Sequence, residues 1–73
     1  MKRKVLNSIN NADGSLCVDI FQRPDGTFGF EEYRRDPEDS RGWYPVGGFE
    51  DVVCPNQERA HAAAIDAVAW FKG

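Results

Sequence analysis

The sequence has few of the residues that bind metals or carry out covalent catalysis. Its 73 residues include one histidine and two cysteines. Cys17 and Cys54 lie far apart and lack the short spacing that is typical of a metal site. In a reducing cytosol they are expected to be free thiols. We therefore expect neither a bound metal nor a cofactor.

Long apolar segments are missing as well. No stretch approaches the roughly 18 apolar residues of a membrane-spanning helix. Lys2, Arg3 and Lys4 are basic, but no apolar run of signal-peptide length follows them. The expectation is a cytoplasmic protein without a membrane partner.

The charge balance is mildly acidic, because 12 acidic residues oppose 9 basic ones and give a net charge of −3. Proteins that bind nucleic acids are normally basic, since Lys and Arg contacts to phosphates dominate their affinity. Nucleic acid is therefore the less favoured partner. Acidic residues gather in the segment DPED, which contributes Asp36, Glu38 and Asp39.

The chain does contain enough apolar material for one small core. It is 41% hydrophobic and 12% aromatic, which is sufficient for a globular domain. A core of this size supplies only about 3–5 kcal/mol of net stability. We expect a single domain over residues 1–73, whose stability could depend on a homodimer or on another partner.

The strongest strand signal is a hairpin over residues 16–35. The segment SLCVDIFQR is rich in β-branched and aromatic residues, and the tripeptide PDG at 24–26 suits a three-residue loop with a bulge. This loop sets a register in which Arg23 lies opposite Thr27. It also pairs Gln22 with Phe28, Phe21 with Gly29, Ile20 with Phe30 and Val18 with Glu32.

Side-chain alternation then assigns the hairpin residues to two faces. The predicted core face carries Val18, Ile20, Phe28 and Phe30. The opposite face, called the outer face below, mixes aromatic and charged residues. Its members are Cys17, Asp19, Phe21, Arg23, Glu31, Tyr33 and Arg35.

Two shorter segments flank this hairpin. Residues 42–47 predict an edge strand, because Pro45 cannot donate to a ladder. If Tyr44 and Val46 face the core, Trp43 joins the outer face. Residues 1–14 leave two alternatives open, namely a fourth strand in which Val5 and Ile9 face inward, or a flexible N-terminus.

The alanine-rich segment 55–72 predicts a C-terminal helix. Pro55 suits the first helical position, and Cys54 or Asn56 would be the N-cap. The predicted fold is therefore α+β, with a three- or four-stranded antiparallel sheet and this helix packed on one face. The expected inward stripe of the helix contains Ala60, His61, Ala64, Ile65, Val68 and Phe71, whereas Trp70 lies outside it.

Catalytic groups are scarce. We interpret His61 as a histidine at the boundary of the core rather than a general base or a ligand. Cys54 near a helix N-terminus is an alternative candidate, as a reactive thiol of lowered pKa. Glu31 and Glu32 are adjacent on a strand and point to opposite faces, so they cannot act on one bond. We expect that the protein is not an enzyme.

Aromatic residues outside the expected core predict a partner-binding surface. Phe21, Tyr33 and Trp43 share the outer face and Trp70 lies off the helix stripe, and these residue types anchor interfaces. Asp36, Glu38 and Asp39 would match positive charge on a protein partner. An intramolecular cover over these rings is the other interpretation.

Nucleic-acid binding through the outer face is the competing hypothesis. Phe21 and Tyr33 would stack on bases, while Arg23, Arg34 and Arg35 would contact phosphates. Nucleic-acid affinity that is lost on Arg23→Ala plus Arg35→Ala would favour this hypothesis. A captured protein that is lost on Trp43→Ala, without nucleic-acid binding, would favour the protein-binding hypothesis.

The order of strand, DG turn, strand, short strand and alanine-rich helix resembles two families. The run from Glu58 to Ile65 is similar to the helix of HicB antitoxins, which implies a partial double-stranded-RNA-binding-like fold. The segments DGTFGFEEYRR and GGFEDVV resemble the three-stranded DNA-binding domain of phage integrases. The small, acidic, motif-poor profile also resembles phage-encoded anti-CRISPR inhibitors. The antitoxin and anti-CRISPR resemblances imply an inhibitor of a basic nucleic-acid-handling partner, such as a nucleoprotein complex, whereas the integrase resemblance implies a sheet that enters a DNA groove.

Overall fold

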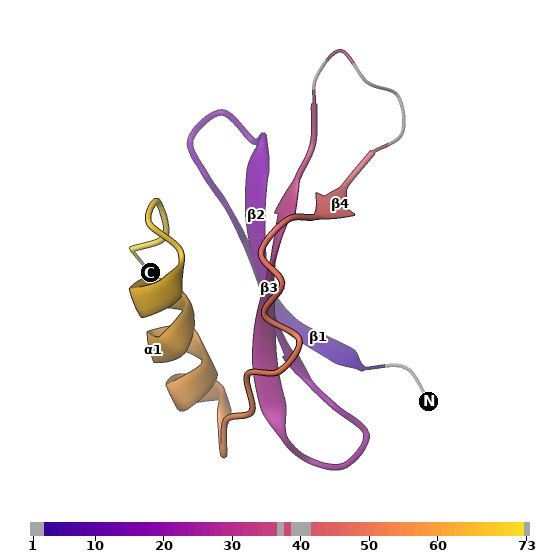
Figure 1. Cartoon of the computed structure of the whole chain (residues 1–73), viewed down its shortest axis with the longest axis vertical. Coiled ribbons are helices and arrows are strands. Elements are labelled where there is room, and N and C mark those ends of the chain that lie inside the picture. Colours follow the sequence, from indigo (N-terminus) through magenta and orange to yellow (C-terminus); the bar gives the residue numbers. More distant parts are fainter. Residues whose placement is uncertain (1–2, 37, 39–41, 73) are drawn as a thin grey trace.

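The computed structural model describes residues 3–36, 38 and 42–72. Within these residues, four antiparallel strands form one sheet in the order β1-β2-β3-β4. One helix, α1, packs against β2 and β3 (Figure 1), so the predicted α+β fold is confirmed. The elements are β1 (Lys4–Asn10), β2 (Leu16–Gln22), β3 (Phe28–Arg34), β4 (Tyr44–Pro45) and α1 (Gln57–Ala67).

The central hairpin has the predicted register. The Arg23 N–H donates to the Thr27 carbonyl at 2.7 Å, and the Gly26 N–H donates to the Arg23 carbonyl at 2.9 Å. Gly26 has a φ of 90°, which a residue without a Cβ adopts without strain. Each of the predicted cross-strand pairs, including Phe21 with Gly29, is present. The assignment of side chains to two faces is therefore correct.

The N-terminal segment forms β1, but a bulge changes which side chains point inward. Val5 pairs with Phe21 and Asn7 pairs with Ile20, so Leu6 is an extra residue. One extra residue moves the side chains on either side of it to opposite faces. Ile9 packs against the core as predicted, whereas Val5 lies on the outer face and is 48% exposed. The prediction that Val5 faces inward is wrong.

Helix α1 is shorter than the predicted range of 55–72. Asn56 is the N-cap, and its side chain accepts a hydrogen bond from the Arg59 N–H at 2.8 Å. Pro55 therefore precedes the cap instead of opening the helix. At the other end Val68 is already extended, with φ −107° and ψ 109°. The Phe71 N–H then bonds to the Val68 carbonyl at 3.0 Å, which closes a turn after the helix.

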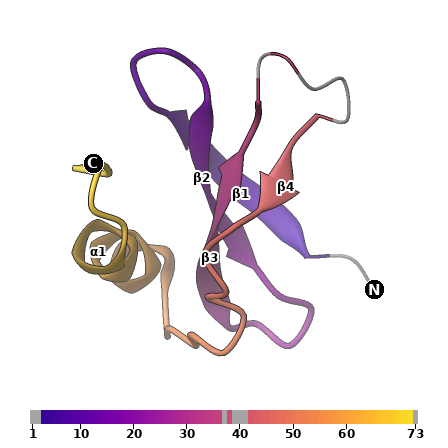
Figure 2. The same ribbon diagram turned by 45° about the horizontal axis from the view of Figure 1, so that its top comes forward.

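The core lies between α1 and the sheet, and Figure 2 shows the helix on one side of the strands. Ala60 and Ala64 are fully buried, and their small side chains allow the helix to approach the sheet closely. His61 is half-buried and Ile65 is 39% exposed, so the inward stripe is narrower than predicted. The remaining core residues are Val18, Ile20, Phe30, Cys54, Val68 and Phe71.

Strand β4 is also shorter than its predicted range of 42–47. It forms the edge of the sheet, as expected from Pro45. Tyr44 and Val46 are 40% and 46% exposed and do not belong to the core cluster. Tyr44 pairs with Arg34 and therefore points to the helix side of the sheet, but neither side chain is covered there, so the premise that they contribute to the core is wrong.

The chain between β4 and α1 runs along the free side of β3. The Val46 N–H donates to the Glu32 carbonyl at 3.0 Å. Further along, Cys54 and Phe28 form an isolated bridge in which each N–H bonds to the other carbonyl, at 2.8 and 2.9 Å. Figure 1 shows this segment lying beside β3 before it reaches the helix. It covers most of the β3 edge without forming a regular strand.

Candidate binding surface

One half of the outer face is closed by arginine side chains. Phe21 was expected to be an exposed anchor, but it is only 1% exposed. The guanidinium carbon of Arg3 lies 4.0 Å from the centre of the Phe21 ring, and that of Arg23 lies 5.0 Å from it. Cations at such distances are attracted to the ring face and cover its apolar surface. Phe21 therefore has no surface to offer a partner, and the prediction that it anchors one is wrong.

Arg23 is held within the protein. Its Nη1 donates to the Phe28 carbonyl at 3.1 Å, and its Nη2 donates to the Glu50 and Val52 carbonyls at 3.1 and 3.0 Å. The guanidinium group thus links the segment after β4 to the first residue of β3 through hydrogen bonds. It also occupies the space above Gly29, where an added Cβ would lie 2.8 Å from Nη2. The role predicted for Arg23, contact with phosphates, conflicts with these bonds.

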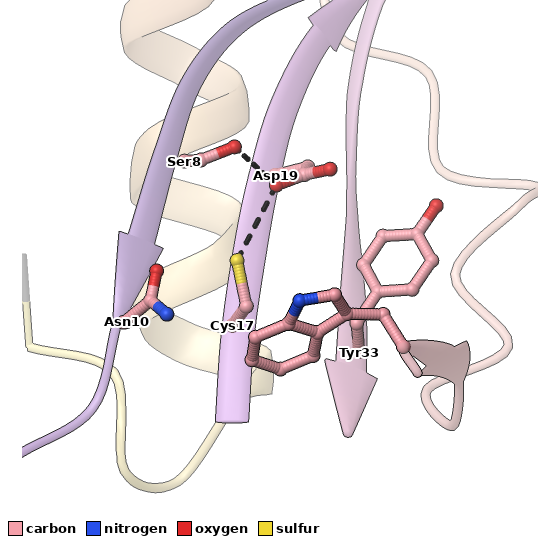
Figure 3. Close-up of a pocket in the computed structure, with 6 residues that line it drawn as sticks. Ser8, Asn10, Cys17, Asp19 and Tyr33 are labelled. Carbon is pink, nitrogen blue, oxygen red and sulfur yellow. Dashed lines mark hydrogen bonds between the residues drawn. The ribbon is translucent and has the colours of Figure 1, made fainter. Parts of the chain in front are cut away.

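The other half of the outer face is open and contains a hollow of about 280 Å³. Strands β1, β2 and β3 supply its floor, and α1 lies behind the sheet (Figure 3). Its aromatic residues, Tyr33 and Trp43, were predicted to share this face, and both line the hollow. We call it the outer hollow, and its lining consists of Ser8, Asn10, Cys17, Asp19, Tyr33 and Trp43.

Asp19 gives the floor of the outer hollow a negative charge. Its Oδ1 accepts hydrogen bonds from the Ser8 hydroxyl and, at 3.4 Å, from the Cys17 thiol (Figure 3). Both donors are uncharged, so neither neutralises the carboxylate. On the neighbouring strand, Asp19 lies directly opposite Glu31, which is only 3% exposed. Two acidic residues thus adjoin on this face.

The Cys17 thiol in this hollow is not activated. Burial, and then the hydrogen bond and negative charge of Asp19, raise the pKa of Cys17 to about 11. The thiol therefore stays protonated at neutral pH, whereas nucleophilic cysteines have lowered pKa values. This environment favours binding over covalent chemistry.

The two rings at the rim already contact cations of the same chain. Arg3 donates a hydrogen bond to the Tyr33 hydroxyl. Trp43 is 40% exposed, and the Arg35 guanidinium carbon lies 4.9 Å from its ring centre. Arg35 also donates to the Gly14 carbonyl at 3.3 Å, which fixes it to the turn between β1 and β2. The rim is therefore able to hold guanidinium groups.

The other predicted partner-binding residues lie elsewhere. Trp70 is half-buried, and its Nε1 donates to Glu32 Oε2 at 2.8 Å. It also packs against the core cluster on the helix side of the sheet, so it does not join the outer hollow. Asp36 is exposed and accepts a hydrogen bond from the Glu38 N–H at 3.0 Å. Asp39 lies outside the described residues.

The groups considered for catalysis come from three different segments of the chain. His61 on α1 packs against the Phe71 ring, with ring centres 5.2 Å apart, whereas Cys17 lies on the opposite face of the sheet. Cys54 is buried and its backbone is paired with Phe28. In the described part of the chain, no group of three or more His, Cys, Asp or Glu residues is placed to hold a metal ion. No described helix is long and apolar enough to cross a membrane.

Two features of the surface were not predicted from the sequence. Ser8 and Asn10 line the outer hollow because they flank Ile9, which packs against the core, on a strand that the sequence left as one of two alternatives. Arg3 covers Phe21 from a position outside any strand. The sequence does not show whether a basic residue next to a strand packs over a neighbouring ring or extends into solvent.

Comparison with protein-family models, with curated proteins and with solved structures gives no match to this chain. The resemblances to HicB antitoxins, phage integrases and anti-CRISPR inhibitors therefore remain predictions.

Proposed function

We propose that the protein is a non-catalytic module that binds another protein through β4 and the adjoining outer hollow. The observation that carries this proposal is the clustering of exposed apolar side chains. Trp43, Tyr44 and Val46 fall within four consecutive residues, and we call them the β4 strip. Among the described residues, the large hydrophobic side chains that are exposed are Val5, Trp43, Tyr44, Val46, Val53 and Ile65.

The β4 strip has the character of an interface anchor. Exposed apolar side chains that gather on a surface mark interaction sites. The strip presents such side chains at one edge of the sheet, with Trp43 on the outer face and Tyr44, which pairs with Arg34, on the opposite face. Trp and Tyr are enriched among the residues that contribute most to binding. Strand β4 has only two residues and includes Pro45, which disfavours the addition of a partner strand. We therefore expect contact through side chains rather than through main-chain pairing.

Acidic residues near the strip support a basic partner. Asp36 and Glu38 are exposed and precede the strip in sequence, and Asp19 lies in the adjoining hollow. Complementary charge mainly speeds encounter and selects among partners. The partner that we propose is a basic, nucleic-acid-handling protein that this module blocks by occupying its surface.

Nucleic-acid binding is the second candidate, because Tyr33 and Trp43 lie beside Arg35. Aromatic rings and arginine together can bind single strands. However, Asp19 and Glu31 occupy the same face and would repel phosphates. Of the three arginines predicted for this role, Arg23 is held by carbonyl groups, whereas Arg34 is exposed.

Capture experiments with strip variants test the proposal. Tagged wild-type protein, the double variant Trp43→Ala/Tyr44→Ala and the control Val53→Ala would be used on lysate from the source cell. Val53 is 65% exposed and lies outside the strip, so it controls for the loss of an exposed apolar side chain elsewhere on the surface. We expect a captured protein that the control retains and the double variant loses, with or without nuclease. Capture that persists in the double variant, or that nuclease abolishes, would contradict the proposal.

A further inference from the structure

We propose that the outer hollow binds an arginine side chain of the partner protein. This inference rests on the proposed function, because the hollow adjoins the β4 strip through Trp43. Its volume of about 280 Å³ lies just below the range of about 300–1,000 Å³ for small-molecule sites. A space of that size suits the head group of one side chain better than a cofactor.

The charge of the floor favours a cation. Asp19 accepts hydrogen bonds only from the neutral Ser8 and Cys17 side chains among the contacts found in the described residues. Glu31, directly across the ladder, accepts from the neutral backbone N–H of Glu32 at 3.0 Å. Like charges directly opposite each other on a sheet are destabilising. A cation that enters the hollow next to Asp19 would relieve this repulsion.

The walls of the hollow favour a guanidinium group in particular. Tyr33 and Trp43 present rings, and ring faces attract cations. The Trp43 ring already lies against the guanidinium group of Arg35, and the Tyr33 hydroxyl accepts a hydrogen bond from Arg3. Arginine is planar, stacks on aromatic rings and donates in a fork that matches a carboxylate, whereas lysine is a compact and strongly hydrated charge.

The arginines on the rim allow the sign of the ligand charge to be tested. Arg35 lies against the Trp43 ring and Arg3 bonds to the Tyr33 hydroxyl, whereas Asp19 is the anion that lines the hollow. A cationic ligand is attracted by Asp19 and repelled by Arg35. A phosphate backbone experiences the opposite forces. Removing each charge separately therefore gives opposite results for the two ligand classes.

The probe is a short blocked peptide with a central arginine among glycines and serines, titrated into isotopically labelled protein and followed by NMR. Control peptides carry citrulline, which is the neutral isostere, or lysine. We expect shifts at the Trp43 indole and at the amides of Cys17, Asp19 and Tyr33. Citrulline should weaken binding by more than about tenfold, because the charge-assisted bonds are lost, and lysine should weaken it less.

Two charge variants complete the test. Asp19→Asn should weaken binding of the arginine peptide by about fivefold, whereas Arg35→Ala should strengthen it by about twofold. A short oligo-dT strand is titrated in parallel. Equal binding of the arginine and citrulline peptides would overturn the inference. So would oligo-dT that binds more tightly than the peptide and is weakened by Arg35→Ala.

The two proposals fail in different ways. If the arginine peptide does not bind but the β4 strip variant still loses its captured protein, the hollow proposal fails and the binding function stands. If the peptide binds but the strip variant keeps its partner, the proposed use of the strip fails. Because the citrulline control changes only the ligand, this part of the test does not depend on the folding of a variant.

Discussion

The two faces of the sheet each bury one phenylalanine completely, but by different means. Phe30 on the core face is covered by α1 and packs on Phe49, with ring centres 4.7 Å apart. Phe21 on the outer face is covered by the guanidinium groups of Arg3 and Arg23. Both rings are 1% exposed. Equal burial therefore arises once from a packed second layer and once from individual long side chains.

This difference explains why the outer face is only partly covered. The helix covers its face over β2 and β3, whereas two arginines cover only the rings that they reach. The outer face is accordingly closed around Phe21 and open around Asp19, Tyr33 and Trp43. An incomplete cover made of side chains leaves a hollow beside it.

Truncation of the two phenylalanines should have the largest effect on stability. It also compares a ring that is covered by the helix with a ring that is covered by arginine side chains. Phe30→Ala leaves a cavity that the rigid helix cannot fill, and we expect a loss of about 3–5 kcal/mol. Because net stability at this size is about 3–5 kcal/mol, this variant should be largely unfolded. Phe21→Ala should cost about 1 kcal/mol less, because flexible arginines can settle into the space.

Urea denaturation of both variants, with Phe30→Leu and Phe21→Leu as milder versions, measures this difference. The leucine pair keeps the comparison available if the alanine variant of Phe30 does not fold. If the Phe30 and Phe21 variants lose the same stability in both the alanine and the leucine pair, the arginine side chains cover their ring as rigidly as the helix does. The proposed difference between the two faces would then be wrong.

The core face could be predicted because its information is local. The PDG loop sets the register of the hairpin, and alternation then places Val18, Ile20 and Phe30 inward without reference to distant residues. The helix stripe was predicted less well, because Ile65 lies at the rim and the helix ends before Val68. The periodicity of the helix sequence does not indicate where the helix extends beyond the edge of the sheet.

The outer face could be predicted only in part. Its members Asp19, Tyr33 and Trp43 were assigned to the correct face. The burial of Phe21 was missed because it depends on side chains from outside the strands, which hydropathy scores as solvated although their stems and planar groups cover apolar surface. The outward position of Val5 was missed because it depends on a single bulged residue, Leu6, that no turn motif marks.

Removing Arg23 should have the next largest effect. Arg23→Ala deprives three backbone carbonyls of a donor and uncovers Phe21, so we expect a loss of about 1–3 kcal/mol. Arg23→Lys should recover little, because an ammonium cannot reproduce the planar fork. Arg34→Ala is the matched control, since Arg34 is exposed, and should change stability by less than about 0.5 kcal/mol. Thermal denaturation that finds Arg23→Ala and Arg34→Ala equivalent would refute the role of Arg23.

The Cys17 thiol should make the stability of the protein depend on pH. Its pKa is raised from 9.0 to about 11 in the folded protein, mainly by burial. Between these values the unfolded chain loses the proton while the folded chain retains it, so stability falls as pH rises. The contribution is complete below 9.0 and is lost by about 11. Urea denaturation of wild type and Cys17→Ala across this window should show a steeper decline for wild type, and parallel declines would show that Cys17 is not linked to folding.

The smallest predicted effect isolates the contact between Arg23 and the strand beneath it. Gly29→Ala places a Cβ 2.8 Å from Arg23 Nη2, and the guanidinium must move away from its carbonyl partners. Because the clash involves the end of a flexible side chain, we expect a loss of about 0.5–1 kcal/mol. In the Arg23→Ala background the same substitution should be neutral or slightly stabilising, since glycine weakens a strand interior. A double-mutant cycle that shows additive losses would mean that Gly29 is required for some reason other than the arginine above it.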